Sequence, residues 1–223
     1  MPQLYALLAL LVALVAARER ARRRRPARAV IISPPRSTVI ARDGAVRSVQ
    51  AAELILDRAQ LEQLWGPANL ENLARTYWRF LTRVTLGLIR VVYGTDERSV
   101  VLLGRPLTLL RFGAPEYLLD GDHGKVVWRI RDGLLVARSG RGCGFLAIDA
   151  QRLDDGADGG RARVRIELEV ANFYPAIAVG FSTPVYEITQ NAIHILVTHA
   201  FLRSLAKLDL ARSKVGRLRG DQP

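Results

Sequence analysis

Apolar and charged residues alternate strictly from Ala162 to Ala171. The apolar set is Val164, Ile166, Leu168 and Val170, and the charged set between them is Arg163, Arg165, Glu167 and Glu169. Successive side chains of a strand point to opposite sides of a sheet. The segment is therefore predicted to be a strand with one buried and one solvated face, as in an antiparallel sheet that is covered on one side.

Other short stretches, separated by turn residues, predict further strands of an antiparallel meander. They are approximately Leu86–Tyr93, Val100–Leu103, Leu107–Phe112, Val126–Ile130, Leu134–Ala137 and Gly144–Gln151. A first strand is predicted earlier, at Arg47–Leu56.

Helical patterns lie on both sides of the meander. A short helix from Arg58 to Trp65 should break at Gly66, where Pro67 can occupy the first turn of a second, amphipathic helix. A long last helix is predicted at about Pro184–Leu210. One of its stripes is formed by Ile188, Ala192, Ile195, His199, Leu202 and Ala206. The fold class is thus α+β.

The order of strand, two helices, antiparallel meander and long C-terminal helix resembles the START-like superfamily, also called SRPBCC or helix-grip. The resemblance covers about Arg47–Leu210 and includes stretches such as GKVVWRIRDGLLVA at Gly124–Ala137. It implies a curved antiparallel sheet that grips the last helix around an apolar cavity, and a hydrophobic small molecule or lipid as ligand. The superfamily has no diagnostic catalytic motif.

The N-terminus carries an apolar run, Leu4–Ala17, followed at once by an arginine cluster that includes Arg22, Arg23, Arg24 and Arg25. The run would span roughly 21 Å as a helix, against a hydrocarbon core of roughly 30 Å. Because positive charge favours the cytoplasmic side, residues 1–17 are predicted to be a single-pass transmembrane anchor, with the arginines on anionic lipids at the cytoplasmic surface. A cleaved signal and an arm packed on protein are the alternatives.

Charge is concentrated at the two ends of the chain. The formal net charge is +12, but between Ala29 and Ala211 there are 22 Lys or Arg and 19 Asp or Glu. That balance offers no basic groove for a phosphate backbone, so nucleic acid is not expected as a partner. The predicted organisation is an anchor at 1–17, a basic, Pro-containing juxtamembrane linker at 18–45, the START-like α+β domain at 46–210 and a basic disordered tail at 211–223.

Candidate ligand-binding residues are those expected to face a cavity between sheet and last helix: His199, Trp128, Ile195 and Tyr174. His199 interrupts an apolar stripe, where it would bond either a ligand or a protein group. It is five residues from His194, not four, so the two do not form a helical zinc pair, and neither metal nor cofactor is expected.

Three function classes remain open. The first is a noncatalytic membrane-tethered domain that binds a hydrophobic molecule. The second is a cyclase- or hydrolase-like enzyme on the same scaffold, with His199 as acid or base. The third is a filled-core module that recruits another protein. Two glycine-rich motifs, GRGCG at Gly140–Gly144 and DDGADGG at Asp154–Gly160, are read as turns; Cys143 in the first is read as a structural thiol.

Overall fold

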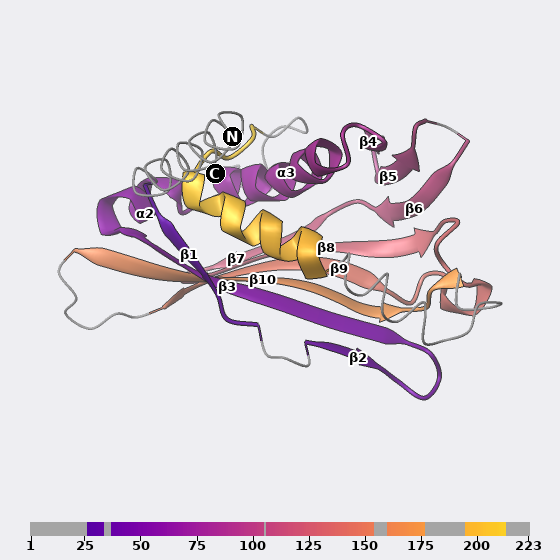
Figure 1. Ribbon diagram of the computed structural model, residues 1–223. Helices are drawn as coiled ribbons and strands as arrows, with labels where there is room; N and C mark the ends of the chain where they lie inside the picture. The colour runs from indigo at the N-terminus through magenta and orange to yellow at the C-terminus, as the bar shows by residue number, and fades with distance from the viewer. Residues whose placement is uncertain (1–25, 34–36, 105, 154–159, 177–194, 213–223) are drawn as a thin grey trace, which may run out of the picture.

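The computed structural model describes residues 26–33, 37–104, 106–153, 160–176 and 195–212. Over these ranges the chain forms a large antiparallel sheet with helices on one of its faces (Figure 1). The predicted anchor, the arginine cluster Arg22–Arg25, the loop 154–159 and the first part of the predicted last helix lie outside them.

Ten strands are found in the described residues, and all their pairings are antiparallel. They are β1 (Arg28–Ile31), β2 (Thr38–Ile40), β3 (Val46–Asp57), β4 (Ile89–Tyr93), β5 (Glu97–Leu102), β6 (Thr108–Gly113), β7 (Glu116–Asp120), β8 (His123–Asp132), β9 (Phe145–Leu153) and β10 (Arg161–Phe173). The order across the sheet is β1-β3-β10-β9-β8-β6-β5-β4, with β2 also on β3 and β7 also on β8.

The register explains the alternation in β10. Ile166 lies opposite Ala52 of β3 and Ala150 of β9, and all three side chains are buried. The charged residues between them face the other side, where Arg47 bonds Glu169 at 2.8 Å. One face of the central sheet is therefore apolar and covered, whereas the other is solvated.

Two helices follow β3, as the sequence predicts. α2 (Arg58–Leu64) ends before Gly66, whose φ of 156° favours glycine, and Pro67 then opens α3 (Pro67–Val84). A C-terminal helix is described over residues 195–204 and continues into the 3-10 turn η3 (Leu205–Lys207). Figure 1 shows α2, α3 and this helix on the same side of the sheet.

Aromatic side chains fill the space between the sheet, α3 and the C-terminal helix. The Trp78 ring lies 5.2 Å from that of Trp128 and 5.5 Å from that of Phe112, and Tyr77 lies 5.2 Å from Phe201. All five residues are buried. The centre of the sheet–helix interface is thus packed core.

The predicted element order is confirmed, with corrections at several strands. Leu134–Ala137 is a turn with one bridge, Val136 to Pro175, because Gly133 reverses the chain and the Val136 N–H bonds back to its carbonyl. β7 was missed because its residues are largely exposed and do not alternate. The last helix ends at residue 204, before the predicted Leu210, and Leu208 adopts a left-handed conformation with φ 52°.

The predicted linker also requires correction. The described part of residues 18–45 contains β1 and β2, which pair with β3 through registers such as Val30 opposite Glu53 and Val39 opposite Arg47. These short segments lack a strong strand pattern of their own, so pairing with the long edge of β3 determines their conformation. The folded domain therefore begins earlier than residue 46.

No helix in the described ranges is both long and apolar enough to span a bilayer.

Candidate functional site

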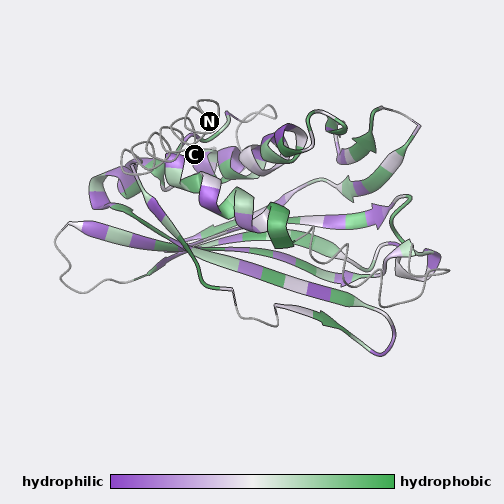
Figure 2. Ribbon diagram, viewed as in Figure 1, coloured by the Kyte–Doolittle hydropathy of each residue, from purple (hydrophilic) through white to green (hydrophobic). Residues whose placement is uncertain are grey.

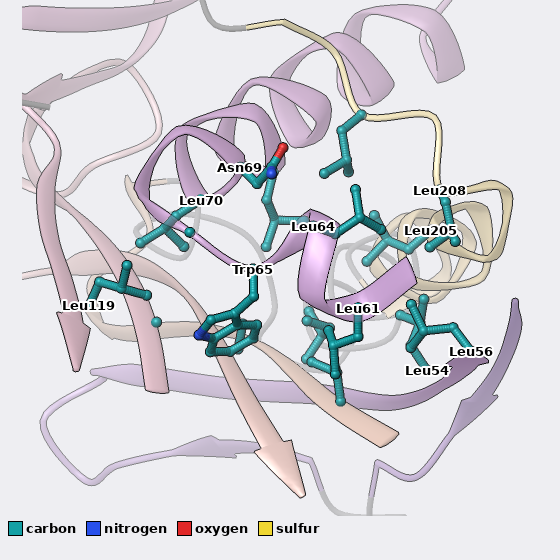
Figure 3. Close-up of a pocket in the computed structure, with 17 residues that line it drawn as sticks. Leu54, Leu56, Leu61, Leu64, Trp65, Asn69, Leu70, Leu119, Leu205 and Leu208 are labelled. Carbon is teal, nitrogen blue, oxygen red and sulfur yellow. The ribbon is translucent and has the colours of Figure 1, made fainter. Parts of the chain in front are cut away.

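An apolar pocket lies at the end of the sheet where α2 meets α3. It is bounded by sheet strands, both helices and the segment after the C-terminal helix, and its volume is about 90 Å³ (Figure 3). The lining residues are Leu54, Leu56, Leu61, Leu64, Trp65, Gly66, Asn69, Leu70, Leu73, Leu119, Gly124, Ala150, Val164, Ile166, Leu205, Leu208 and Leu210.

Local sequence explains how each wall is built. The inward-facing positions of β3 and β10 contribute Leu54 and Ile166 to the floor. On the helical side, Leu70 and Leu73 lie on the apolar stripe of α3. Gly124 leaves room beside them: a Cβ there would lie 3.3 Å from Leu119 Cδ1 and 3.6 Å from Leu70 Cδ1. A larger residue at position 124 would therefore reduce the pocket.

Asn69 is the single polar side chain among the described lining residues, apart from the indole N–H of Trp65. The Asn69 Nδ2 donates to the Gln63 carbonyl at 3.2 Å, and its Oδ1 accepts from Asn72 at 3.2 Å. The Trp65 Nε1 donates to the Gly121 carbonyl at 2.8 Å. Because these groups bond to protein, the surface presented to an occupant is almost wholly hydrocarbon.

Charged groups lie just outside the pocket, next to Trp65. The Arg152 guanidinium is 5.1 Å from the centre of the Trp65 ring, a cation–π distance. Arg152 also pairs with Glu62 of α2 and lies 3.8 Å from Asp122. Trp65 thus separates an apolar interior from a polar rim.

The four predicted ligand-binding residues do not line this pocket, and the structure does not gather them at one site. Trp128 belongs to the aromatic core and is 1% exposed. Tyr174 packs against Gly140 and donates its hydroxyl to Asp43 Oδ2 at 2.8 Å, which raises the Tyr174 pKa. Ile195 begins the described part of the C-terminal helix, where it is partly buried. Ligand contact by any of them stays a prediction.

His199 points toward the sheet, as its helical phase predicts, and bonds a protein group there. Its Nε2 lies 2.8 Å from Gln50 Oε1, and Gln50 is fully buried on β3. The Gln50 amide donates to Ser37 Oγ at 2.6 Å and to Ser48 Oγ at 3.3 Å. Burial, and secondly the nearby positive charge of Arg203, lowers the pKa of His199, which favours the neutral form of the ring.

Gln50 is the one side chain of the described residues that His199 is seen to hydrogen-bond, and an amide is not an acid or base at neutral pH. No cluster of three or more His, Cys, Asp or Glu side chains suited to a metal ion occurs in the part of the chain that the structure describes. The neighbouring Thr198 hydroxyl is buried and has no partner among the same residues.

The other predicted motifs lie in turns or outside the described ranges. Gly140–Gly144 belongs to the connection between β8 and β9, and Cys143 is exposed there. Near the end of β10 the register with β3 shifts between Val170 and Phe173, and Asn172 has a φ of 50°, which is typical of a bulge. The pocket itself was not found from the sequence, because its lining is spread from Leu54 to Leu210.

No family model matches the sequence, and no curated protein matches it either. Among solved structures, the chain is similar to norcoclaurine synthase from Thalictrum flavum, with 14% identity, 78% of this chain and 89% of that chain covered, and a TM-score of 0.32. The chain is also similar to human STARD10, with 10% identity, 77% of this chain and 72% of that chain covered, and a TM-score of 0.30. For human StAR-related lipid transfer protein 5 the identity is 11%, the coverage is 91% of this chain and 98% of that chain, and the TM-score is 0.32.

These identities and TM-scores support no inference about what the chain binds. The observed order of one long strand, two helices, antiparallel strands and a final helix over the sheet is nevertheless the order that the START-like resemblance predicts.

Proposed function

We propose that the domain binds a hydrophobic small molecule, or the end of a lipid chain, in the pocket between α2, α3 and the sheet. The observation that carries the proposal is the lining: hydrocarbon on every described wall, with Asn69 and Trp65 already bonded to protein. Apolar pockets with few polar groups are typical sites for such ligands.

The size of the pocket limits what it holds without rearrangement. Its volume of about 90 Å³ is below the roughly 300 to 1,000 Å³ of sites for drug-sized ligands. A longer molecule requires one wall to move. The wall formed by Leu208 and Leu210 is the candidate, because it follows the C-terminal helix as irregular chain and is tied to α3 by the Ala211 N–H to Thr76 Oγ1 bond of 2.8 Å.

A fluorescent fatty-acid analogue, dansyl-undecanoic acid, tests the proposal on a chain that begins at Pro26 and needs no detergent. We expect saturable binding with a blue-shifted emission. Gly124→Val should weaken it about tenfold or more, because the added carbons displace roughly two methylene groups of the probe at about 0.8 kcal/mol each.

Gly104→Val is the matched control. A Cβ at Gly104 meets nothing within 4 Å, and Gly104 does not line the pocket, so the same atoms are added elsewhere. Equal loss of binding in both variants, or none in either, would show that the probe binds outside the pocket.

The second part of the proposal concerns place. The apolar run Leu4–Ala17 would hold the domain at the cytoplasmic face of a membrane, with the cluster Arg22–Arg25 on anionic headgroups. A membrane-held domain with an apolar pocket has access to hydrophobic molecules that are scarce in water.

A further inference from the structure

A group of exposed leucines lies at the end of α3, remote in the chain from the pocket-lining α2–α3 junction. The α3–β4 loop carries Leu86 and Leu88, and the β5–β6 loop carries Leu103 and Leu107; these four residues are called the leucine tip below. All are exposed, Leu86 by 92% and Leu103 by 63%. Single exposed leucines are ordinary in proteins, but a contiguous group of them is not.

The two loops are held side by side. The Leu103 N–H donates to the Leu88 carbonyl at 2.7 Å, and the adjoining strands pair Ile89 with Leu102. In Figure 2 the strands β4 to β6 that carry the loops show green, hydrophobic stretches with purple, hydrophilic bands between them. The leucine tip is therefore one surface, fixed to the sheet.

The backbone at the tip contradicts the usual sequence rule. α3 ends in a Schellman motif, in which the Gly87 N–H bonds the Thr82 carbonyl and the Leu86 N–H bonds the Arg83 carbonyl. The residue at the left-handed position of this motif is normally glycine, but here it is Leu86 with φ 53°. Leu103 also has a positive φ, of 61°.

A leucine that has a strained backbone and is exposed to solvent adds no packing energy to the fold. A role in binding would explain why leucine, and not glycine, stands at this position. Charge identifies the partner. The segments 72–95 and 98–115, which form most of α3 and all of β4 and β6, contain seven arginines and no Asp or Glu. Arg79, Arg83 and Arg90 are exposed near the tip.

The neighbouring acids, Asp96 and Glu97, lie at the other end of the β4–β5 hairpin, where Tyr93 pairs with Arg98. We propose that the leucine tip inserts into the interfacial layer of a membrane that carries anionic lipids, with Arg83 and Arg90 on the headgroups. Apolar side chains flanked by arginines match both layers of such a surface.

Depth of insertion tests this in the full chain, because the apolar N-terminal run would hold the protein on vesicles whatever the tip does. In a Cys143→Ser background, Leu86→Cys and, separately, Leu118→Cys would carry the fluorophore NBD. Leu118 is a matched control, since it is 54% exposed on β7 between Glu116 and Asp120. Vesicles would be phosphatidylcholine alone or with 30% phosphatidylserine, each with and without brominated acyl chains.

We expect a blue shift and bromolipid quenching at position 86 on phosphatidylserine vesicles, and neither at position 118. Equal responses at the two positions, or none at position 86, would overturn the proposal. Insertion of equal depth and extent into phosphatidylcholine alone would overturn the assignment of an anionic partner.

Two variants, read with NBD at Leu103→Cys, separate insertion from folding. Leu86→Gly places glycine where the Schellman motif favours it, so the melting temperature should stay the same or rise. The ratio of membrane-inserted to non-inserted tip should fall about tenfold or more, because a leucine side chain is lost from the apolar surface. Arg83→Gln with Arg90→Gln should lower that ratio about fivefold per charge, and this loss should shrink in high salt. Unchanged insertion in both variants would refute the role of the tip.

Discussion

Replacement of His199 by leucine should destabilise the domain whether or not a ligand is bound. Gln50 is fully buried, and its two amide ends are bonded to Ser37, Ser48 and His199. Leucine fits the apolar stripe of the C-terminal helix in size and polarity, but it removes the donor to Gln50 Oε1. The cost therefore falls on the glutamine, not on position 199.

The magnitude follows from that stranded carbonyl. A buried acceptor left without its partner costs about 1 to 3 kcal/mol. In a domain of this size each kcal/mol lowers the melting temperature by about 2 to 4 °C, so the expected loss is about 2 to 12 °C. Gln50→Leu combined with His199→Leu should recover much of it, because both polar partners are then removed.

Thermal melts of the four proteins of this double-mutant cycle, with and without dansyl-undecanoic acid, check the prediction. The same loss under both conditions is expected for His199→Leu. If His199→Leu has the same melting temperature as the unmodified protein but binds the probe more weakly, the reasoning is refuted. The result would then mean that His199 contacts the ligand and that its bond to Gln50 adds no stability.

Three further predictions concern the same domain. Burial and Arg203 lower the pKa of His199 in the folded protein below the unfolded value of about 6.5, so as the pH falls the unfolded chain binds the proton first. The difference in unfolding free energy between the unmodified protein and His199→Leu should therefore be full above about pH 6.5 and should decrease below it. Thermal melts of both proteins at about pH 7.5 and 5.5 measure this difference. Thr198→Val should raise the unfolding free energy by about 1 kcal/mol, because it removes a buried hydroxyl without a described partner. A clear decrease of the unfolding free energy in urea denaturation would instead show that the Thr198 hydroxyl donates to an acceptor outside the described residues. Gly133→Ala should lower the unfolding free energy by on the order of 3 kcal/mol, since φ is 145° and a Cβ would lie 2.2 Å from the Leu109 carbonyl oxygen. Gly142→Ala is the control, because Gly142 has a φ of 76° but lies in open space, and it should lower the unfolding free energy by only about 1 kcal/mol. Equal losses in the two variants would show that the Cβ at position 133 does not clash.

Elements with a strong period of their own could be predicted from the sequence. β10 alternates over many residues, and α3 has both a proline start and an apolar stripe. β1, β2 and β7 could not, because they have three to five residues and their pairing partner fixes them. Such strands are determined by tertiary contact, which local patterns do not contain.

The same distinction separates what was predictable at the sites. The helical phase correctly predicted that His199 faces the sheet. It could not predict the partner, because Gln50 is 149 residues away in the chain. Alternation likewise turned Trp128 inward, but it could not tell packed core from pocket wall. The difference depends on Trp78 and Phe112, which arrive from other elements and fill the space.

The last prediction concerns where the chain can be shortened, and it follows from β1 and β2. The full chain should sediment with membranes if Leu4–Ala17 anchors it, whereas a chain that begins at Pro26 should stay in solution and fold. A chain that begins at Arg42 loses both strands, and with them the Ser33 hydroxyl that accepts from the Ala51 N–H at 2.8 Å and the Ser37 acceptor of Gln50.

Loss of β1 removes the ladder to β3 and the packing of Ala29 and Ile31 on the core, a contribution on the order of 2 kcal/mol or more. It also leaves most of one edge of the 12-residue strand β3 unpaired, which favours association between copies. We therefore expect the chain from Arg42 to melt lower and to aggregate, as measured by thermal unfolding and light scattering. Equal behaviour of the two shortened chains would show that β1 and β2 add nothing to the fold, and a full chain recovered in the soluble fraction would refute a spanning anchor.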